Sequence, residues 1–352
     1  MIKNITGKKD FIESLRGKQS TFILAMSNTK TANIEGITQA GIPGKIFLTP
    51  TLDAEFLTTG EVRSLEDIAT TSKGVPTPAL ITRAVHLLNP FSNIELLNLG
   101  VEKIPNIEYF KIHNFDIKPS ESIQKGANID AQTLFQKGIE FGQNYECKDE
   151  YIILAESVPS GTTTAKATAL ALGYDCKDAF SSSFKDVPND IRETTISDAL
   201  KNIPAHSDIF TILGTVSDNM IIFNAGFILG LNNKIPLVLA GGTQMACVLL
   251  VVNKILAVMQ GEIETSNLAL ATTSWIANDD KSDIKKILEL CSFSINSYYA
   301  DFNFSLSSHP ALKLYDEGEA KEGVGAGGAL VYGMINTLTK ESITEQVEEF
   351  LK

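Results

Sequence analysis

The chain has 352 residues, with 30 lysines and arginines against 42 aspartates and glutamates, and its formal net charge is −12 at pH 7. With 43% hydrophobic and 20% charged residues, the composition is that of a globular, enzyme-sized protein. Nucleic acids and anionic membranes attract proteins through clusters of lysine and arginine. The sequence has no such cluster, so we expect neither as a partner.

Patterns for export, membrane insertion or metal binding are also missing. No apolar stretch of signal-peptide type follows the lysines near the N-terminus, and the most apolar window, 235–259, is interrupted by Pro236, two glycines and Lys254. The four cysteines and four histidines have no zinc-site spacing. We therefore expect a cytoplasmic protein with free thiols and no metal or other cofactor.

The N-terminal part of the chain predicts a mixture of elements. An amphipathic helix is expected over 10–16, and the apolar run 21–26 has the length and composition of a strand. A long stretch rich in Thr, Gly and Pro follows, and helical spacing returns over 79–88. This part of the chain alone does not define a fold class.

From residue 149 onward, short apolar runs alternate with helix-like segments. Uniformly apolar strands are typical of parallel sheets that helices cover on both faces. The sequence therefore predicts an α/β fold with a doubly wound, mostly parallel, Rossmann-like sheet. The runs that we expect to be strands are 151–155, 208–213, 235–240, 268–271 and 299–304.

The two ends of the chain predict a smaller unit. The last helix, expected over 341–352, is acidic and amphipathic. We expect residues 1–20 and 339–352 to form a small helical subdomain beside an α/β domain of residues 21–338.

In an open parallel sheet, ligands bind where the strands end and the loops to the next helices converge. The loop after the expected strand 151–155 is Glu156-Ser157-Val158-Pro159-Ser160-Gly161-Thr162-Thr163-Thr164. A tight turn before a hydroxyl-rich helix start aims backbone N–H groups at an anion, which predicts a phosphate site. The alternative is an ordinary threonine cap at the start of a helix. Glu156 is either catalytic or a cap for a neighbouring helix.

A second glycine-rich segment, Lys321–Ala329, precedes the expected helix 330–338. Its glycines allow the backbone to approach a ligand closely. Glu322 lies at the mouth of this loop, where partial burial favours a role as a general base. The alternative is a flexible hinge with a surface glutamate. We expect His309 to be a loop residue rather than an acid or base, and Trp275 to belong to the core rather than to stack on a ring.

Four segments carry a resemblance to a known family. Ala155–Ala165 resembles the E-M-G-I-G-N-T-T-A loop of nicotinate-nucleotide–dimethylbenzimidazole phosphoribosyltransferases, and Lys321–Ala329 resembles their G-E-G-T-G-A-A loop. The sequence of these segments is more similar to that of an archaeal and cyanobacterial branch. The motifs of that branch are E-x-x-P-x-G-T-T-T-A, L-A-G-G-T-Q-M and K-E-G-V-G-A-G-G. The second of these is Leu239–Met245, and Gly74–Ala84 is similar to the branch's G-I-P-T-P-A-L-I-T-R-A. The resemblance thus covers nearly the whole chain.

The resemblance implies transfer of phosphoribose from nicotinate mononucleotide to a benzimidazole-type base, giving the α-linked nucleotide of a cobamide lower ligand. It also implies a homodimer and Glu322 as the catalytic base. The reaction further needs a group that stabilises positive charge on the ribose, and we expect Glu156 to be that group. From the rim loops we expect the following residues to bind the phosphate and nucleotide: Ser160, Gly161, Thr162, Thr163, Asp218, Gly241, Gly242, Thr243, Gln244, Gly323 and Gly325.

The chain departs from the family pattern in the first loop. The two glycines nearest Glu156 are absent, Pro159 removes one N–H donor, and Ser160 replaces the first glycine of the branch's P-G-G turn. The identity of the base stays open, with adenine or a phenolic base as alternatives. The alternative functions are hydrolysis of the N-glycosidic bond and nucleotide binding without catalysis.

Overall fold

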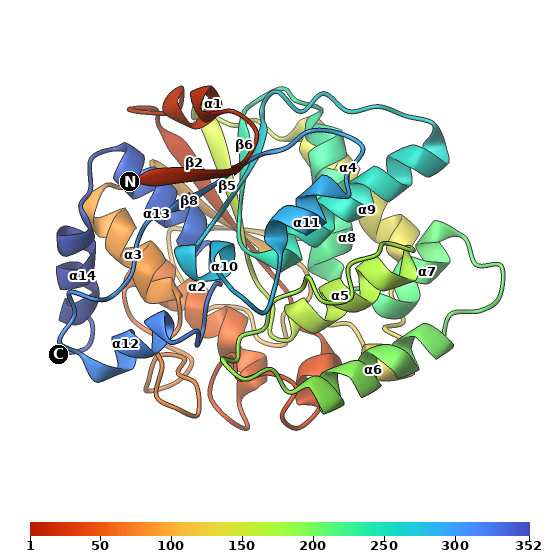
Figure 1. The fold of residues 1–352 in the computed structure, drawn as a ribbon, viewed down its shortest axis with the longest axis horizontal. Helices are drawn as coiled ribbons and strands as arrows, with labels where there is room; N and C mark the ends of the chain where they lie inside the picture. The colour runs from red at the N-terminus through yellow and green to blue at the C-terminus, as the bar shows by residue number, and fades with distance from the viewer.

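An eight-stranded sheet forms the centre of the computed structural model, which describes residues 1–352 (Figure 1). The strand order is β1-β8-β7-β6-β5-β2-β3-β4, and all neighbours are parallel except the antiparallel pair β1–β8. The predicted α/β fold with a mostly parallel sheet is therefore confirmed. The strands are β1 Ile2–Thr6, β2 Ser20–Met26, β3 Asn93–Asn98, β4 Lys111–Asn114, β5 Tyr151–Ser157, β6 Leu237–Ala240, β7 Leu268–Thr272 and β8 Asn296–Ala300.

The strand order changes direction at β2. The next two strands, β3 and β4, lie on one side of β2, whereas β5 pairs with its other side and leads to β6, β7 and β8. Ligands bind in open α/β sheets at such a switch point, beyond the carboxyl ends of the strands. From the topology we therefore expect a ligand site at the loops that follow β2 and β5.

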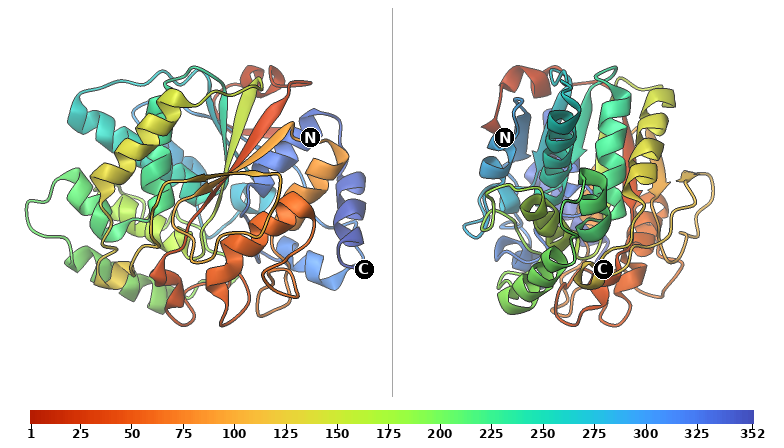
Figure 2. Two further views of the ribbon diagram at one scale, coloured as in Figure 1. Left: turned by 180° about the vertical axis from the view of Figure 1, so that it is seen from behind. Right: turned by 90° about the vertical axis from the view of Figure 1, so that its right-hand side faces the viewer.

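Helices cover both faces of the sheet (Figures 1 and 2). Along β2, Phe22 and Leu24 face one buried core while Ile23 and Ala25 face the other, which explains the uniformly apolar sequence. The helices are α1 Lys9–Glu13, α2 Thr49–Thr59, α3 Ala79–Leu88, α4 Ala131–Asn144, α5 Gly161–Ala171, α6 Asn189–Lys201, α7 Ile209–Val216, α8 Asn219–Leu231, α9 Thr243–Met259, α10 Ser274–Ala277, α11 Ile284–Glu289, α12 Pro310–Asp316, α13 Ala326–Ile335 and α14 Lys340–Glu349, with 3₁₀ turns at Lys30–Asn33, Ile46–Leu48 and Ile123–Lys125.

The prediction of a strand at 208–213 is wrong, because these residues begin α7. The Asp208 carboxylate accepts a hydrogen bond from the Thr211 N–H at 2.8 Å and so caps a helix. Leu213 and Val216 are buried while Ile209 and Phe210 are half-buried, so the short apolar run is one side of a helix. The predicted strand 299–304 is also displaced, since β8 ends at Ala300.

The N-terminus and the C-terminus both lie on the left of the view in Figure 1. Residues 2–6, within the segment predicted to join a helical subdomain, form the edge strand β1 of the main sheet. Ile12 of α1 and Ile343 of α14 belong to the same core as α3 and α13. A separate subdomain of residues 1–20 and 339–352 stays a prediction, and its first residues are strand rather than helix.

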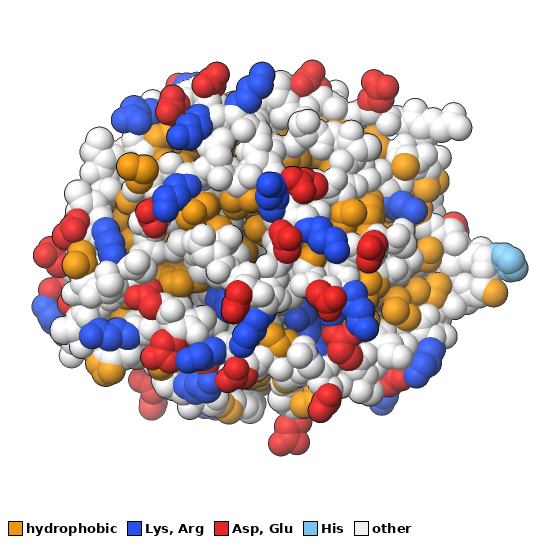
Figure 3. All heavy atoms as spheres, viewed as in Figure 1, with side chains coloured by type: hydrophobic (Ala, Val, Ile, Leu, Met, Phe, Trp, Pro, Cys, Tyr) orange, Lys and Arg blue, Asp and Glu red, His pale blue; other side chains and the backbone are white.

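The surface drawn in Figure 3 mixes acidic and basic side chains, without a continuous basic area on that face. None of the helices combines the length and the apolar character needed to cross a membrane.

Candidate active site

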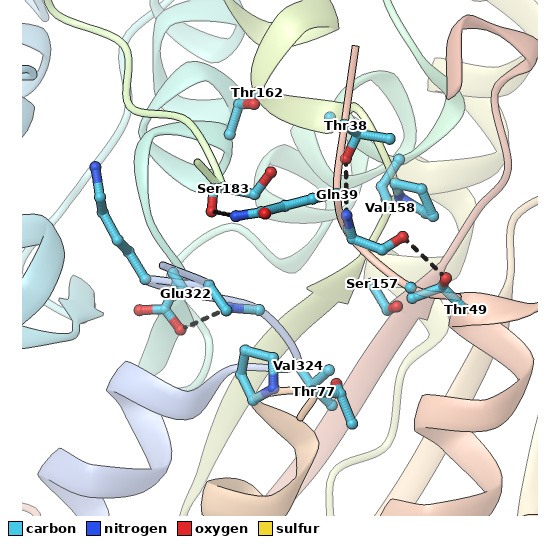
Figure 4. Close-up of a pocket in the computed structure, with 18 of the residues that line it drawn as sticks. Thr38, Gln39, Thr49, Thr77, Ser157, Val158, Thr162, Ser183, Glu322 and Val324 are labelled. Carbon is cyan, nitrogen blue, oxygen red and sulfur yellow. Dashed lines mark hydrogen bonds between the residues drawn. The ribbon is translucent and has the colours of Figure 1, made fainter. Parts of the chain in front are cut away.

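A cavity of about 880 Å³, including its open mouth, lies at the switch point of the sheet (Figure 4). The loops after β2, β5 and β6 contribute to its wall, as expected for the carboxyl edge of a parallel sheet. The remaining wall comes from segments far apart in the sequence: Thr49 and Asp53 of α2, residues 69–71, 75–78 and 181–183, Ile276 of α10, and residues 320–324.

The loop after β5 presents a helix N-terminus to this cavity. Ser160 has φ = 65°, a left-handed conformation that turns the chain sharply into α5. The N–H groups of Gly161 and Thr163 donate to the carbonyls of Val158 and Ser160, whereas the Thr162 N–H donates no hydrogen bond within the protein. A free N–H in the first helical turn, together with the helix dipole, favours an anion at this position.

Close packing fixes this loop. A Cβ on Gly161 would clash with the side-chain amide atoms of Gln244, so the loop and the start of α9 are in direct contact. Behind the loop, the buried Arg192 donates from Nη2 to the Thr162 carbonyl at 2.9 Å. Burial lowers the pKa of Arg192 to about 10, which leaves it cationic at neutral pH and adds a positive field behind the helix N-terminus.

The cavity has few cations of its own. Lys321 is the one lysine or arginine in the lining, and its ammonium is 2.8 Å from Asp279, with both side chains buried. The hydroxyls of Ser160 and Thr243 are buried and have no hydrogen-bond partner in the protein. A phosphate here would be held by backbone N–H groups and hydroxyls rather than by an ion pair.

Glu322 lies at the opposite wall, before α13. Oε1 accepts from the N–H groups of Gly323 (3.2 Å) and Gly327 (3.0 Å), and Oε2 accepts from the Thr273 N–H (3.0 Å) and the Thr272 hydroxyl (3.2 Å). Burial raises its pKa to about 7, although these hydrogen bonds act in the opposite direction. A carboxylate that titrates near neutrality beside a cavity suits a general base.

Glu156, at the end of β5, has fewer partners. Its Oε2 accepts from the Val158 N–H at 3.1 Å and from Gln244 Nε2 at 3.4 Å. Burial raises its pKa to about 8, and the nearby carboxylates of Glu322 and Asp218 add to the effect. Glu156 is therefore largely protonated at pH 7, and a positive charge in the cavity would favour its ionised form.

Two further buried aspartates flank this pair. Asp53 of α2 accepts from the hydroxyls of Thr77 and Ser157, each at 2.7 Å, and burial raises its pKa to about 6. Asp218 accepts from the Thr164 hydroxyl at 2.5 Å and from the Ile221 N–H at 3.0 Å, so it joins the starts of α5 and α8. No three His, Cys, Asp or Glu side chains are arranged to hold a metal ion.

The structure brings most of the predicted site residues to one cavity. Four others lie behind its wall: Thr163 in the first turn of α5, Asp218 at the start of α8, Gly241 after β6, and Gly325 as the cap of α13. The predicted residues that line the cavity are Glu156, Ser160, Gly161, Thr162, Gly242, Thr243, Gln244, Glu322 and Gly323.

Sequence reasoning missed a second part of the lining, formed by Thr38–Gly41, Asp53 and Ser181–Ser183. The serine run was a usable signal, because three consecutive hydroxyls suit a polar ligand. Gln39 and Asp53 carried no local pattern. His309 stands at the N-cap of α12, and Trp275 packs against Phe304 and Tyr315; neither lines the cavity.

Two solved structures share this fold. One is the nicotinate-nucleotide–dimethylbenzimidazole phosphoribosyltransferase of Thermus thermophilus, with a TM-score of 0.59 and 14% identity over 94% of this chain and 83% of that one. The other is CobT from the same organism, with a TM-score of 0.58, 14% identity and coverage of 94% and 84%. The protein therefore has the α/β fold of these two structures.

Comparison of the amino-acid sequence finds relatives that match nearly the whole chain. The UPF0284 protein of Sulfurisphaera tokodaii is 34% identical over 351 residues, which span 99% of this chain and 96% of the relative. The UPF0284 protein of Saccharolobus solfataricus is 33% identical over 352 residues, with the same coverage. The chain belongs to the UPF0284 family. No protein-family model matches it.

Proposed function

We propose that this protein is a phosphoribosyltransferase that moves phosphoribose from nicotinate mononucleotide to a benzimidazole-type or purine base, for the lower ligand of a cobamide. The observation that carries the proposal is the pairing, in one cavity, of an open helix N-terminus with two carboxyl groups whose pKa values are raised to about 7 and about 8. The family resemblance of the loops and the fold of the Thermus thermophilus structures support the same reaction class.

The reaction needs little acid assistance, because the nicotinate ring of the donor is already cationic. The bond between ribose C1 and the nicotinate nitrogen breaks, and its electrons return to the ring. A ring nitrogen of the incoming base forms the new bond to C1 from the opposite face, which inverts C1 and gives the α product. The nitrogen that attacks is the unprotonated ring nitrogen, and the proton on the other ring nitrogen of the base then passes to a carboxylate, which leaves the new nucleotide's base neutral.

Each requirement has a candidate group in the cavity. We assign the 5′-phosphate to the Thr162 N–H and the Ser160 hydroxyl, a proposal that their lack of partners within the protein and the position of Arg192 behind them support. Binding of the cationic nicotinate ring favours release of the Glu156 proton to solvent, and the resulting carboxylate stabilises the positive charge that develops on the ribose. Glu322, held by its four donors, accepts the proton. We further propose a homodimer.

One observation favours a second candidate, a nucleotide-binding protein without catalysis. Each oxygen of Glu322 already accepts two hydrogen bonds, which is also the arrangement of a structural cap. For Glu322 to accept a proton, at least one donor has to be displaced, and the Thr272 hydroxyl at 3.2 Å is the one that rotates freely.

The test is a product assay with purified protein, nicotinate mononucleotide and a panel of dimethylbenzimidazole, benzimidazole, adenine and p-cresol, read by mass. A new nucleotide together with released nicotinate supports the transferase. Ribose 5-phosphate without a new nucleotide would mean a hydrolase. Nucleotide binding by calorimetry with no product from any base would favour the second candidate.

A further inference from the structure

Glu319 lies behind the cavity wall, three residues before Glu322, and is not itself part of the lining. Its side chain is 2% exposed, and its carboxylate accepts hydrogen bonds from three separate segments of the chain. The donors are the side-chain amide of Gln39, the ammonium of Lys73 and, at 3.3 Å, the backbone N–H of Lys185. A single buried carboxylate thus joins the loop after β2, the loop before α3 and the loop after α5 to the loop before α13.

The three donors belong to segments that contribute to the cavity wall. Gln39 lines the cavity itself, and Lys73 and Lys185 each lie within two residues of a lining residue. Glu319 therefore anchors three parts of the wall at one point. We call these segments the outer wall: residues 38–41, 69–78 and 181–185.

Further hydrogen bonds join the outer wall to the loop that carries Glu322. The Ser183 carbonyl accepts from the Gln39 side chain (Figure 4) and, at 3.0 Å, from the Ala320 N–H. Ala320 has φ = 47°, a left-handed conformation that a residue with a side chain keeps only where its surroundings hold it. Because Ala320 is two residues before Glu322, the contacts that fix the outer wall also fix the backbone from which Glu322 projects.

These contacts need the negative charge of Glu319. Burial acts to raise the pKa of Glu319, but the hydrogen bonds from Gln39, Lys73 and the Lys185 N–H outweigh it and lower the pKa. The carboxylate is therefore ionised at neutral pH. Its cationic partner, Lys73, has a half-exposed side chain, so a substitution there weakens the contacts from the solvent side without opening the core.

Resting on the function proposed above, we propose that Glu319 is a positioning residue, which holds the outer wall against the Glu322 loop while the nucleotide is bound. Glu319 takes no part in bond making. It acts on nucleotide affinity through Gln39 and residues 181–183, which line the cavity, and on turnover through Ala320 and the Glu322 loop.

The first experiment measures hydrogen exchange in the free protein and so needs neither substrate nor turnover. Lys73→Met removes the ammonium from Glu319. We expect the Lys185 and Ala320 N–H groups, which connect to Lys73 through Glu319, to exchange about 3- to 10-fold faster, with strand β5 unchanged. Faster exchange confined to residues 69–78 would overturn the inference.

The matched control for this experiment is Lys30→Met. It removes a lysine of similar exposure from an ion pair with Glu121, at 2.6 Å, outside the cavity lining. The exchange rates of the Lys185 and Ala320 N–H groups should stay at their wild-type values in this variant. Faster exchange there after either substitution would show a general loosening of the protein and overturn the inference.

The second experiment measures calorimetric affinity and steady-state rates with nicotinate mononucleotide. In Lys73→Met we expect the Kd and KM for the nucleotide to rise about 3- to 10-fold with kcat within about twofold, and Lys73→Arg, which keeps the cation, to restore them. Glu319→Gln, which places an amide N–H against Gln39, should also lower kcat at least about tenfold. If that variant does not fold, the two Lys73 variants decide.

A merely structural network would change the Tm of Lys73→Met and leave Kd, KM and kcat at their wild-type values, and this result would overturn the inference. Failure of the proposed function looks different: the wild-type protein would release no nicotinate with any base. Hydrogen exchange and nucleotide affinity would then still decide whether Glu319 positions the outer wall.

Discussion

Two loops of the cavity share a local design and differ in the hydrogen bonds that their glutamates accept. In each, a glutamate precedes a left-handed residue that begins a helix: Glu156 before Ser160 (φ = 65°) and α5, and Glu322 before Gly325 (φ = 68°) and α13. The loops also touch, since the Val324 N–H donates to the Glu156 carbonyl at 2.9 Å. The same geometry thus occurs twice at one edge of the sheet.

The two loops differ in which backbone N–H groups donate to the glutamate carboxylate. Glu322 folds onto the start of its own helix and accepts from the Gly327 N–H, so this helix end is already capped. Glu156 bonds to the Val158 N–H and leaves the Thr162 N–H of α5 without a partner. A helix N-terminus binds an external anion only when the protein does not supply one itself. We therefore assign the phosphate to α5 and the proton transfer to Glu322.

The largest expected effect comes from removing the proposed base. Glu322→Gln should lower kcat by about 10²- to 10⁴-fold, because an amide does not accept the proton, with little change in affinity for nicotinate mononucleotide. The pKa of about 7 also predicts that the wild-type kcat/KM rises with pH through 7 as Glu322 ionises, and that the variant loses this rise. Steady-state rates between pH 5.5 and 9 and calorimetry test both.

The control for this change is Glu317→Gln, the same substitution at an exposed glutamate five residues away, which should keep full activity. In the Glu322→Gln variant, the new amide would also face donors that now meet a carboxylate, so a modest loss of stability is expected. A variant that retains wild-type turnover would identify Glu322 as a structural cap and remove it from the mechanism.

A charge placed at the other loop should abolish nucleotide binding. Gly161→Asp puts a carboxylate beside the Thr162 N–H, where it would occupy the helix end as Glu322 does at α13 and repel a phosphate. Gly161→Asn has the same size and the same contact with Gln244 but no charge. We expect the aspartate variant to bind at least about tenfold more weakly than the asparagine variant by calorimetry. Equal affinities would place the phosphate elsewhere.

Glu156→Gln should separate function from stability. The folded-state pKa of about 8 lies above the ordinary value of 4.5, so the folded protein holds this proton more tightly than the unfolded chain. The stabilisation is complete below about pH 4.5 and is lost as pH rises through 8. The variant, which has no proton to lose, should therefore have a higher Tm than the wild type at pH 9 and a similar Tm at pH 5.

The same variant should have about 10- to 100-fold lower kcat, since it no longer stabilises positive charge on the ribose. Thermal unfolding at the two pH values, with activity measured in parallel, tests the pair of expectations. A Tm below that of the wild type at pH 9 would show that the carboxylate is stabilised by its surroundings rather than strained by burial.

The alternation of strands and helices from residue 149 onward was predictable from sequence, because strands that are buried on both faces are uniformly apolar. The sequence pattern did not predict strand β3, because the strand contains Glu95, a charged residue that interrupts the apolar run. Glu95 is buried because it pairs with His113 of the neighbouring strand β4 at 2.5 Å, a partner that only the tertiary structure supplies. A short apolar run such as 208–213 is ambiguous in another way, since it fits a strand and a helix face equally.

The candidate site likewise contains residues that the sequence predicted and residues that it did not. Glu156, Gly161 and Glu322 were found because each belongs to a contiguous loop whose turn, helix start and carboxylate are adjacent in sequence. Gln39 and Asp53 depend on how the long segment after β2 folds back over the sheet edge, and nothing near them in sequence reports that path. The loops after β5 and before α13 are thus locally encoded, and the part of the lining that holds Gln39 and Asp53 is not.

The smallest expected effect tests the departure at Ser160. Its left-handed conformation costs a side-chain-bearing residue about 1 kcal/mol that glycine does not incur, partly offset by the greater freedom of glycine in the unfolded chain. Ser160→Gly should therefore raise the free energy of unfolding by about 0.5 kcal/mol relative to Ser160→Ala, which keeps the strain. Both variants lose the unpartnered hydroxyl, so both should bind nicotinate mononucleotide several-fold more weakly. Denaturant unfolding and calorimetry separate the contributions. If the two variants are equally stable, the backbone at this turn is not strained, and the serine adopts the left-handed conformation at no conformational cost.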